Sequence, residues 1–245
     1  MKILKRILIG VGIVLVAGVL GLAVWGNDAY QPTDVALAAL QSDVQVNVTE
    51  QNGFIVFAPT DETPKTGFVF YPGGRVDFRA YSPALRRISE AGYLVSVVKV
   101  PINFAFLDIN AANKVIDQFP EIEHWAVGGH SLGGVAASSF ASGNLDKVQG
   151  LVLWASYPAN DALKDTAIKV VSIYGTNDMA GMEPFQKSKS LLPPTTQFVV
   201  IDGGNHAQFG AYGPQGGDNA AGIPMEEQWA KAVDATVSLL ASLSK

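Results

Sequence analysis

The stretch W-A-V-G-G-H-S-L-G-G-V-A-A, residues 125–137, decides the fold. Its first residues have the apolar character of a buried strand end, and residues 132–140, rich in Ala and Ser, are typical of a helix. Ser131 therefore falls on the turn between them, the context that a G-x-S-x-G nucleophile elbow requires. Gly129 and Gly133 flank it because a serine on a strained turn leaves no room for side chains two residues away. The hydroxyl of Ser131 is thus predicted to stand clear of the backbone.

Strand and helix patterns alternate on both sides of this turn. Strands are predicted over residues 44–48, 54–58, 67–71, 93–98, 125–128, 148–155, 168–174 and 197–201. Helices are predicted over residues 35–40, 82–90, 110–119, 132–140, 184–191 and 226–243. Gln51-Asn52-Gly53 predicts a tight hairpin turn between the first two strands. Strands that are apolar on both faces indicate an α/β fold, with a mostly parallel sheet and helices on both faces.

The N-terminus has the pattern of a membrane anchor. Three basic residues, Lys2, Lys5 and Arg6, precede residues 7–25, which carry no charge and no proline. As a helix, this apolar run would be about 28 Å long, close to the thickness of the hydrocarbon layer of a bilayer. A cleaved signal peptide is the alternative, but its apolar region is shorter and ends in small residues, unlike Val24-Trp25-Gly26. Positive residues stay on the cytoplasmic side, which would place the remaining chain across the membrane.

These patterns divide the chain into four parts. They are a cytoplasmic basic segment (1–6), a transmembrane anchor (7–25), a linker (26–43) and one α/β domain (44–245). A chain of 245 residues with 48% apolar residues has ample material for the core of one large domain.

The composition excludes several classes of function. Asp and Glu number 22 against 17 Lys and Arg, and three of the basic residues precede the anchor, so the rest of the chain is strongly acidic. That charge argues against nucleic acid as a partner. The absence of cysteine excludes disulfides, thiolate metal sites and a cysteine nucleophile. No cofactor and no metal is expected.

Three histidines are available as the base that a serine nucleophile needs. His130 is adjacent to Ser131, and its side chain is expected to point away from the hydroxyl as a packing residue. His124 precedes the strand and so belongs to the opposite end of the sheet. His206 follows the last strand in a Gly-Gly-Asn loop, at the carboxyl ends where open α/β sheets place their chemistry. His206 is therefore the predicted base.

The base in turn needs an acid that fixes its tautomer and stabilises the imidazolium ion. Asp178, four residues beyond the strand that ends at Tyr174, is the best placed. Asp161, after the preceding strand, is the reserve candidate, and Asp202 lies at a strand end where capping explains it. The chain order of serine, acid and histidine that accompanies a nucleophile elbow favours Asp178.

Two backbone N–H groups are predicted to stabilise the oxyanion of a tetrahedral intermediate. The first belongs to Leu132, immediately after the nucleophile. The second is assigned to Gly74, in a Pro-Gly-Gly stretch after the strand that ends at Tyr71, although an ordinary turn also explains that stretch.

Four motifs together resemble the α/β-hydrolase superfamily. They are Y-P-G-G-R-V-D at 71–77, G-G-H-S-L-G-G at 128–134, G-T-N-D at 175–178 and N-H-A-Q-F-G at 205–210. The chain is most similar, over about residues 44–243, to small bacterial hydrolases of the α/β-hydrolase fold 5 group, which are related to dienelactone hydrolases. This resemblance implies a hydrolase with Ser131, Asp178 and His206 as its triad. The chain departs from dienelactone hydrolases in having serine where their nucleophile is cysteine, and its oxyanion loop begins with Pro72 where His-Gly is usual.

The sequence thus predicts a membrane-anchored serine hydrolase that cleaves carboxylic esters or thioesters through an acyl-enzyme on Ser131. Only a short segment separates Ala155 from the next predicted strand, so we expect no large cap and an accessible site for a small-molecule or lipid ester. Two alternatives stay open. One is an acyltransferase that uses the same triad, and the other is a non-catalytic hydrolase-like domain that binds at the membrane.

Overall fold

Eight strands of the computed structural model, which describes residues 2–51 and 53–244, form one sheet in the order β1-β2-β4-β3-β5-β6-β7-β8. They are β1 (Val46–Gln51), β2 (Phe54–Pro59), β3 (Thr66–Tyr71), β4 (Leu94–Val98), β5 (His124–His130), β6 (Gly150–Trp154), β7 (Lys169–Gly175) and β8 (Gln197–Ile201). β2 pairs antiparallel with β1 and β4, and the other strands pair in parallel. The predicted α/β class with a mostly parallel sheet is confirmed.

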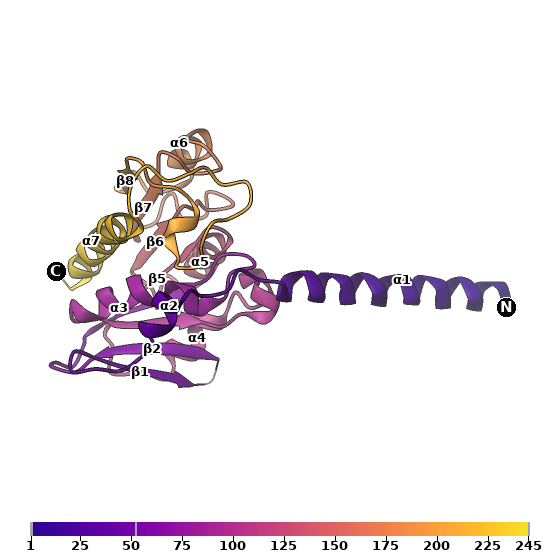
Figure 1. Ribbon diagram of the computed structural model, residues 1–245, viewed down its shortest axis with the longest axis horizontal. Coiled ribbons are helices and arrows are strands. Elements are labelled where there is room, and N and C mark those ends of the chain that lie inside the picture. The colour runs from indigo at the N-terminus through magenta and orange to yellow at the C-terminus, as the bar shows by residue number, and fades with distance from the viewer. Residues whose placement is uncertain (1, 52, 245) are drawn as a thin grey trace.

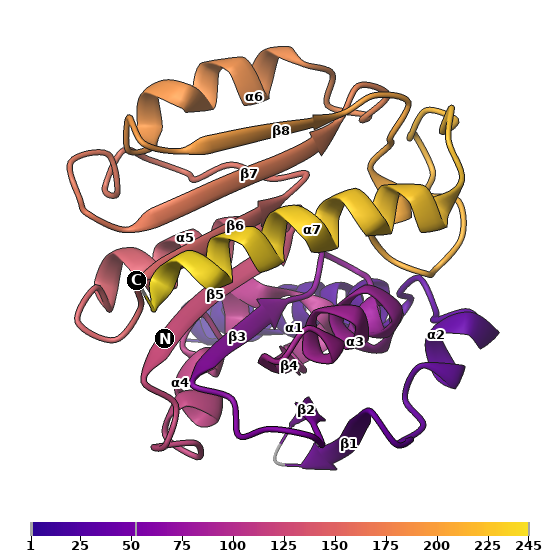
Figure 2. The same cartoon turned by 90° about the vertical axis from the view of Figure 1, so that its left-hand side faces the viewer.

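Helices cover both faces of the sheet (Figures 1 and 2). One face packs against α2 (Asp34–Ala38), α3 (Ser82–Glu90) and α7 (Met225–Leu243), and the other against α4 (Ala111–Ile116) and α5 (Leu132–Gly143). A further helix, α6 (Glu183–Ser188), packs Phe185 on Tyr174 of β7, with ring centroids 4.3 Å apart. Short 3-10 turns are η1 (Phe78–Tyr81), η2 (Pro101–Asn103), η3 (Ala105–Leu107), η4 (Lys189–Leu191) and η5 (Ala207–Phe209).

The central strand β3 shows why this sheet is buried on both sides. Phe68 and Phe70 belong to the core under α3 and α7, whereas Val69 and Tyr71 belong to the core under α4 and α5. Successive side chains of a strand point to opposite faces, so a continuous apolar run fills both cores. Parallel pairing then brings the carboxyl ends of β3, β5, β6 and β7 to one edge of the sheet, which we call the rim.

Most predicted elements occur where the patterns place them, and the differences have local causes. Helix 82–90 agrees at both ends with α3, whereas the strand predicted over 44–48 begins at Val46. The carboxylate of Asp43 accepts hydrogen bonds from the N–H groups of Gln45 (2.9 Å) and Val46 (3.0 Å), which holds the chain in a turn before the strand. The predicted hairpin is confirmed by the antiparallel pairing of β1 with β2, and Asn52 of its turn lies outside the described residues.

The N-terminal helix α1 (Lys2–Asn27) projects from the α/β domain (Figure 1). Within the described residues, one stretch, Gly10–Asn27, is long and apolar enough to cross a membrane. The segment expected to be a linker, 26–43, lies on the domain: the N–H of Tyr30 donates to the carbonyl of Arg75 (2.8 Å), and that of Thr33 donates to the carbonyl of Ala211 (2.8 Å). These hydrogen bonds attach the segment after α1 to the loops that follow β3 and β8.

Candidate active site

Ser131 occupies the turn between β5 and α5 with a strained backbone. Its φ of 52° and ψ of −125° lie outside the regions that residues with side chains normally adopt, a conformation that costs about 1–3 kcal/mol. The surrounding chain holds it there: its N–H donates to the carbonyl of Trp154 (3.0 Å), and its carbonyl accepts from Oγ of Ser156 (2.6 Å). Its own side chain makes no capping hydrogen bond to α5. Ser131 instead lines a cavity at this end of the sheet.

The two glycines of the elbow are sterically required. A Cβ atom on Gly129 would lie 2.4 Å from the carbonyl carbon of Gly133, and one on Gly133 would lie 2.3 Å from the carbonyl oxygen of Tyr71. Both positions are backbone-to-backbone approaches that no rotamer change relieves. Close packing of β3, β5 and the start of α5 thus produces the turn that presents Ser131.

His206 and Asp178 form a buried pair. Nδ1 of His206 and Oδ2 of Asp178 are 2.8 Å apart, and both side chains are almost wholly inaccessible to solvent. With a carboxylate on Nδ1, the imidazole is held as the tautomer whose Nε2 accepts a proton. Ser131 and His206 line the same cavity, which has a volume of about 300 Å³. The structure therefore brings together the three side chains that the sequence singles out.

Close contact between two rim loops explains how Asp178 reaches His206. A Cβ atom on Gly175, at the end of β7, would lie 2.0 Å from the carbonyl oxygen of Gly204. The N–H of Asn177 donates to that same carbonyl (2.8 Å). The loops after β7 and β8 thus touch along their backbones, and the second oxygen of Asp178 accepts from the N–H of Ala180 (2.9 Å).

The other two acidic candidates lie elsewhere. Asp202 is exposed and accepts from the hydroxyl of Thr176 (3.3 Å), a bond local to its own loop. Asp161 is exposed, and its carbonyl accepts from the N–H of Lys164 (3.0 Å). Within the described residues, Asp178 is the one carboxylate in contact with the ring of His206.

Asp218 is a site residue that sequence reasoning missed. Its Oδ1 accepts from the N–H groups of Met179 (3.1 Å) and His206 (3.4 Å), and its Oδ2 accepts from the N–H of Ala207 (2.8 Å). One carboxylate thus ties the Asp178 loop to the His206 loop. The only signal in the sequence is an aspartate in a Gly-rich loop before the last helix, which is a common turn pattern.

Gln228 holds the loop that carries His206 through hydrogen bonds to its backbone. This side chain of α7 is fully buried, and it donates to the carbonyl (2.8 Å) and accepts from the N–H (3.0 Å) of Asn205. A glutamine on the apolar face of a helix is the sequence signal that could have found it, because a buried amide must be hydrogen-bonded.

His130 is buried beneath the site. Its Nδ1 lies 2.9 Å from the hydroxyl of Tyr81, which also accepts from the N–H of Gly73 (3.0 Å). Its ring lies 4.5 Å, between centroids, from that of His206. Burial, and next the neighbouring His206, hold the pKa of His130 well below its usual range. Burial thus disfavours the imidazolium form of His130, and through Tyr81 this residue supports the loop after β3.

That loop carries the second predicted oxyanion donor, Gly74. Its N–H makes no hydrogen bond within the described part of the chain, and the N–H of Leu132, the first of α5, has no acceptor inside the helix. A Cβ atom on Gly74 would lie 2.6 Å from Cδ1 of Leu132, so glycine lets the two segments approach. Gly74 and Leu132, the residue after Ser131, therefore lie next to each other.

The cavity beside Ser131 is mostly apolar. Its other lining residues are Leu132, Val135, Ala155, Ser156, Tyr157, Met179, Ala180 and Gln215. Its volume is at the lower end of the range for ligand sites, which suits a small acyl or alkyl group. Among the described residues, no cluster of three or more His, Asp or Glu could hold a metal ion.

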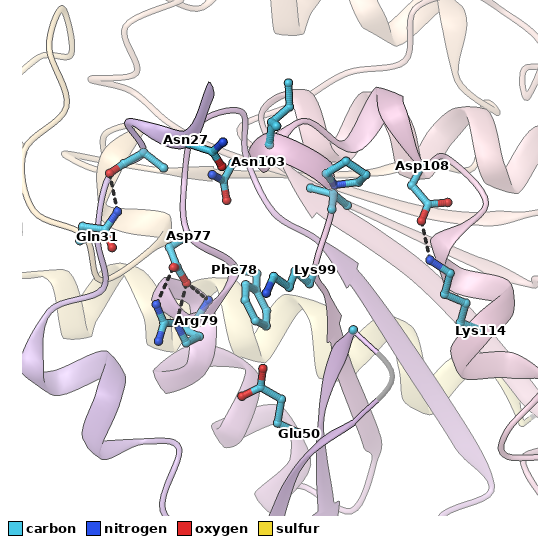
Figure 3. A pocket seen from close by; sticks show the side chains of 15 residues that line it. Asn27, Gln31, Glu50, Asp77, Phe78, Arg79, Lys99, Asn103, Asp108 and Lys114 are labelled. Atoms are coloured by element: carbon cyan, nitrogen blue, oxygen red, sulfur yellow. Dashed lines mark hydrogen bonds and ion pairs between the residues drawn. The ribbon is translucent and has the colours of Figure 1, made fainter. Parts of the chain in front are cut away.

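A larger cavity, of about 570 Å³, is lined by a different set of residues (Figure 3). It is lined by no serine and no histidine. Two of its acids are paired with bases, Asp77 with Arg79 (2.7 Å) and Asp108 with Lys114 (2.6 Å). Although it is larger, its described lining offers no serine beside a histidine, whereas Ser131 and His206 both line the smaller cavity.

Comparison with known proteins agrees with the fold. The sequence profile of the alpha/beta hydrolase family matches residues 67–230. A thermostable esterase from Pseudomonas putida ECU1011 superposes with a TM-score of 0.61 at 16% identity, over 85% of this chain and 87% of that one. The esterase domain of a Rhodothermus marinus protein gives 0.58 at 14%, over 82% and 98%. Thermogutta terrifontis esterase 2 gives 0.57 at 13%, over 81% and 94%. A search of curated protein sequences finds no match.

Proposed function

The chain belongs to the alpha/beta hydrolase family, and from this premise we propose that it is a serine hydrolase that cleaves carboxylic esters or thioesters through an acyl-enzyme on Ser131. The observation that carries the proposal is the 2.8 Å contact between His206 and Asp178 on the wall of the cavity that Ser131 also lines. Structural similarity to three proteins described as esterases supports the reaction class.

In this mechanism, Nε2 of His206 takes the proton of Ser131 as Oγ attacks the substrate carbonyl carbon. Asp178 stabilises the imidazolium ion that results. The N–H groups of Leu132 and Gly74 donate to the oxyanion, each worth about 3–4 kcal/mol if well aimed. His206 returns its proton to the leaving alcohol or thiol, and the same steps with water release the acid.

The placement at the membrane is a second part of the proposal. We infer that α1 crosses the bilayer once and is retained, with residues 1–6 in the cytoplasm, 7–25 in the membrane and the α/β domain (44–245), joined through 26–43, on the far side. The length and apolar character of Gly10–Asn27 support this assignment. Cleavage of the N-terminal segment would instead release the domain, and the mass of the mature chain distinguishes the two outcomes.

Turnover of p-nitrophenyl acetate tests the chemistry. Ser131→Ala should lower kcat by about 10³-fold or more, since residues that act as a unit lose nearly all activity when one is removed. Ser139→Ala is the matched control, because Ser139 is an exposed serine of the same helix whose hydroxyl donates to the carbonyl of Val135 within that helix. Equal activity of the two variants would refute the mechanism. Product analysis with an added alcohol separates hydrolysis from acyl transfer.

A further inference from the structure

We propose that an apolar ridge beside α1, formed by Trp25, Phe104, Phe106, Leu107 and Leu132, lies in the bilayer surface, and that the active site takes its ester from the membrane. This inference rests on the proposed function, because it assumes that α1 spans the membrane and that Ser131 is the nucleophile. It adds the substrate class: an amphiphilic ester with a long acyl or alkyl chain that stays in the lipid while its carbonyl reaches Ser131.

The ridge begins on the membrane helix itself. The ring of Trp25 stacks on that of Phe104, with centroids 5.5 Å apart. The amide of Asn103 donates to the carbonyl of Gly26 (3.1 Å), and a Cβ atom on Gly26 would lie 2.7 Å from the carbonyl oxygen of Ile102. Residues 102–104 therefore lie against the last turn of α1, at the base of the helix that projects in Figure 1. Tryptophan at a helix end is typical of the membrane interface.

The ridge is exposed where a water-facing loop would be polar. Leu107 is 56% exposed, Trp25 50%, Phe106 44% and Leu132 39%. Scattered apolar residues on a surface need no explanation, whereas a contiguous set at the foot of a membrane helix indicates contact with lipid. A second protein could also cover such a surface, but continuity with α1 favours the bilayer in which α1 would lie.

The segment is held in one orientation relative to α1. Ile102 and Asn103 have positive φ values of 44° and 56°, and the carbonyl of Asn103 accepts from the N–H of Arg75 (2.9 Å). The guanidinium of Arg75 lies 4.6 Å from the centroid of the Trp25 ring and also donates to the carbonyl of Asp28 (2.6 Å). The domain is thereby fixed on the end of α1 with the ridge turned toward the same lipid.

Apolar surface continues from the ridge to the nucleophile. Gly74 lies between Phe104 and Leu132, two members of the ridge. A Cβ atom on Gly74 would be 3.6 Å from the ring of Phe104 and 2.6 Å from the side chain of Leu132. Leu132 also lines the catalytic cavity, next to Ser131. The apolar members of the ridge thus lead from Trp25, whose ring contacts the guanidinium of Arg75, through Phe104 to Leu132 beside the elbow.

The polarity of the surface changes just beyond α1. The 570 Å³ cavity is bordered by Asn27 and Asn103 and, farther on, by the ion pair of Asp108 with Lys114 (Figure 3). Its acidic residues (Glu50, Asp77 and Asp108) and its basic residues (Arg79, Lys99 and Lys114) are equal in number. A polar zone directly after an apolar one matches the order of headgroups and acyl chains in a bilayer.

Fluorescence quenching tests the position of the ridge directly. The chain has no cysteine, so Leu107→Cys gives one site for a bimane label in the full chain, reconstituted into phosphatidylcholine vesicles with or without doxyl-labelled lipid. The control is Leu145→Cys, at an exposed leucine (42%) that precedes β6 and so lies at the opposite end of the sheet from the rim. We expect strong quenching at 107 and little at 145. Equal quenching at the two sites would overturn the proposal.

A substrate comparison tests the consequence. Phe106→Ser combined with Leu107→Ser should lower hydrolysis of p-nitrophenyl palmitate embedded in the vesicles by about tenfold or more, because both side chains lose part of their burial in lipid, while soluble p-nitrophenyl acetate is hydrolysed as before. Leu145→Ser should change neither rate. An equal loss on both esters would contradict membrane delivery. If the unmodified chain hydrolyses neither ester, the proposed function fails, and the quenching result still decides where the ridge lies.

Discussion

Asp178 is distinguished from its rivals by one contact, the 2.8 Å approach of its Oδ2 to Nδ1 of His206. Three aspartates, Asp161, Asp178 and Asp202, were candidates for the acid, and sequence order favoured the neighbour of His206 without excluding the other two. Burial of the pair matters as much as the distance, because a carboxylate shielded from water interacts more strongly with a developing imidazolium ion.

Asp178→Asn should therefore lower kcat for p-nitrophenyl acetate by about 10³- to 10⁴-fold, because the amide can favour the wrong imidazole tautomer. Asp202→Asn is the matched control, since its exposed carboxylate accepts from the hydroxyl of Thr176 and does not contact the ring of His206 within the described chain. Comparable rates for the two variants would mean that the acid has been misassigned.

Gly133 is the residue of the elbow at which an added side chain would clash most closely with the backbone. Adding a methyl group there places it 2.3 Å from the carbonyl oxygen of Tyr71 and 2.4 Å from that of Pro72, both main-chain atoms. Gly133→Ala should destabilise the fold by about 1–3 kcal/mol and remove most activity. Gly143→Ala, near the end of the same helix with nothing within 4 Å of the added atom, should leave Tm and turnover unchanged. A fully active Gly133→Ala enzyme would show that the backbone approach is not as close as described.

Among the helices and strands, those with a regular hydrophobic pattern could be predicted from the sequence. α3 was predicted at both ends because it has an amphipathic repeat with a proline at its start and a glycine after its end. The buried strands were recognisable as unbroken apolar runs, and their carboxyl ends located the catalytic loops. The 3-10 turns at Phe78–Tyr81 and Ala105–Leu107 were missed, since a single turn has too few residues to show a repeat.

The loop that carries Asp218 was also beyond prediction. Its role depends on backbone N–H groups of two other loops, and those meet only when β7 and β8 pair. Asp218→Ala leaves these buried donors without an acceptor, which should cost about 1–3 kcal/mol and lower kcat by about tenfold through a displaced His206. Thermal melting and turnover measure both effects, and Asp218→Asn, which keeps one acceptor oxygen, should lie between the variant and the parent. An unchanged kcat in Asp218→Ala would remove Asp218 from the positioning of the base.

For the molecule as a whole, the association of α1 with the α/β domain was invisible in the sequence. A hydropathy pattern identifies the helix, but the stacking of Trp25 on Phe104 and the bonds of Arg75 join residues far apart along the chain. Segment 26–43 has the composition of a linker, and its bonds to the loops after β3 and β8 depend on the completed fold. Contacts of this kind follow from tertiary structure, not from any local repeat.

Stability of the whole chain should depend on pH through His130. In the unfolded chain this imidazole takes up a proton near its ordinary pKa of 6.5, whereas burial keeps the pKa well below that value in the folded state. The unfolded state therefore binds more protons as the pH falls below about 6.5, and the free energy of unfolding decreases. His130→Gln should show a shallower fall in Tm between about pH 7 and pH 5 in detergent solution. Burial raises the pKa of the Asp77 carboxyl, but hydrogen bonds from Arg79 outweigh burial and lower it below its usual value. Asp77 should therefore affect stability only at more acidic pH. An identical slope in both proteins would place the acid sensitivity elsewhere.

The most direct measurement of the central claim is the mass of the full chain after reaction with a fluorophosphonate. Such reagents phosphonylate a serine only when a neighbouring base activates its hydroxyl. We predict one adduct per chain, located by peptide mapping on Ser131, and at most slow labelling in His206→Ala. No adduct where a known serine esterase is labelled, or an adduct on another residue, would contradict the account.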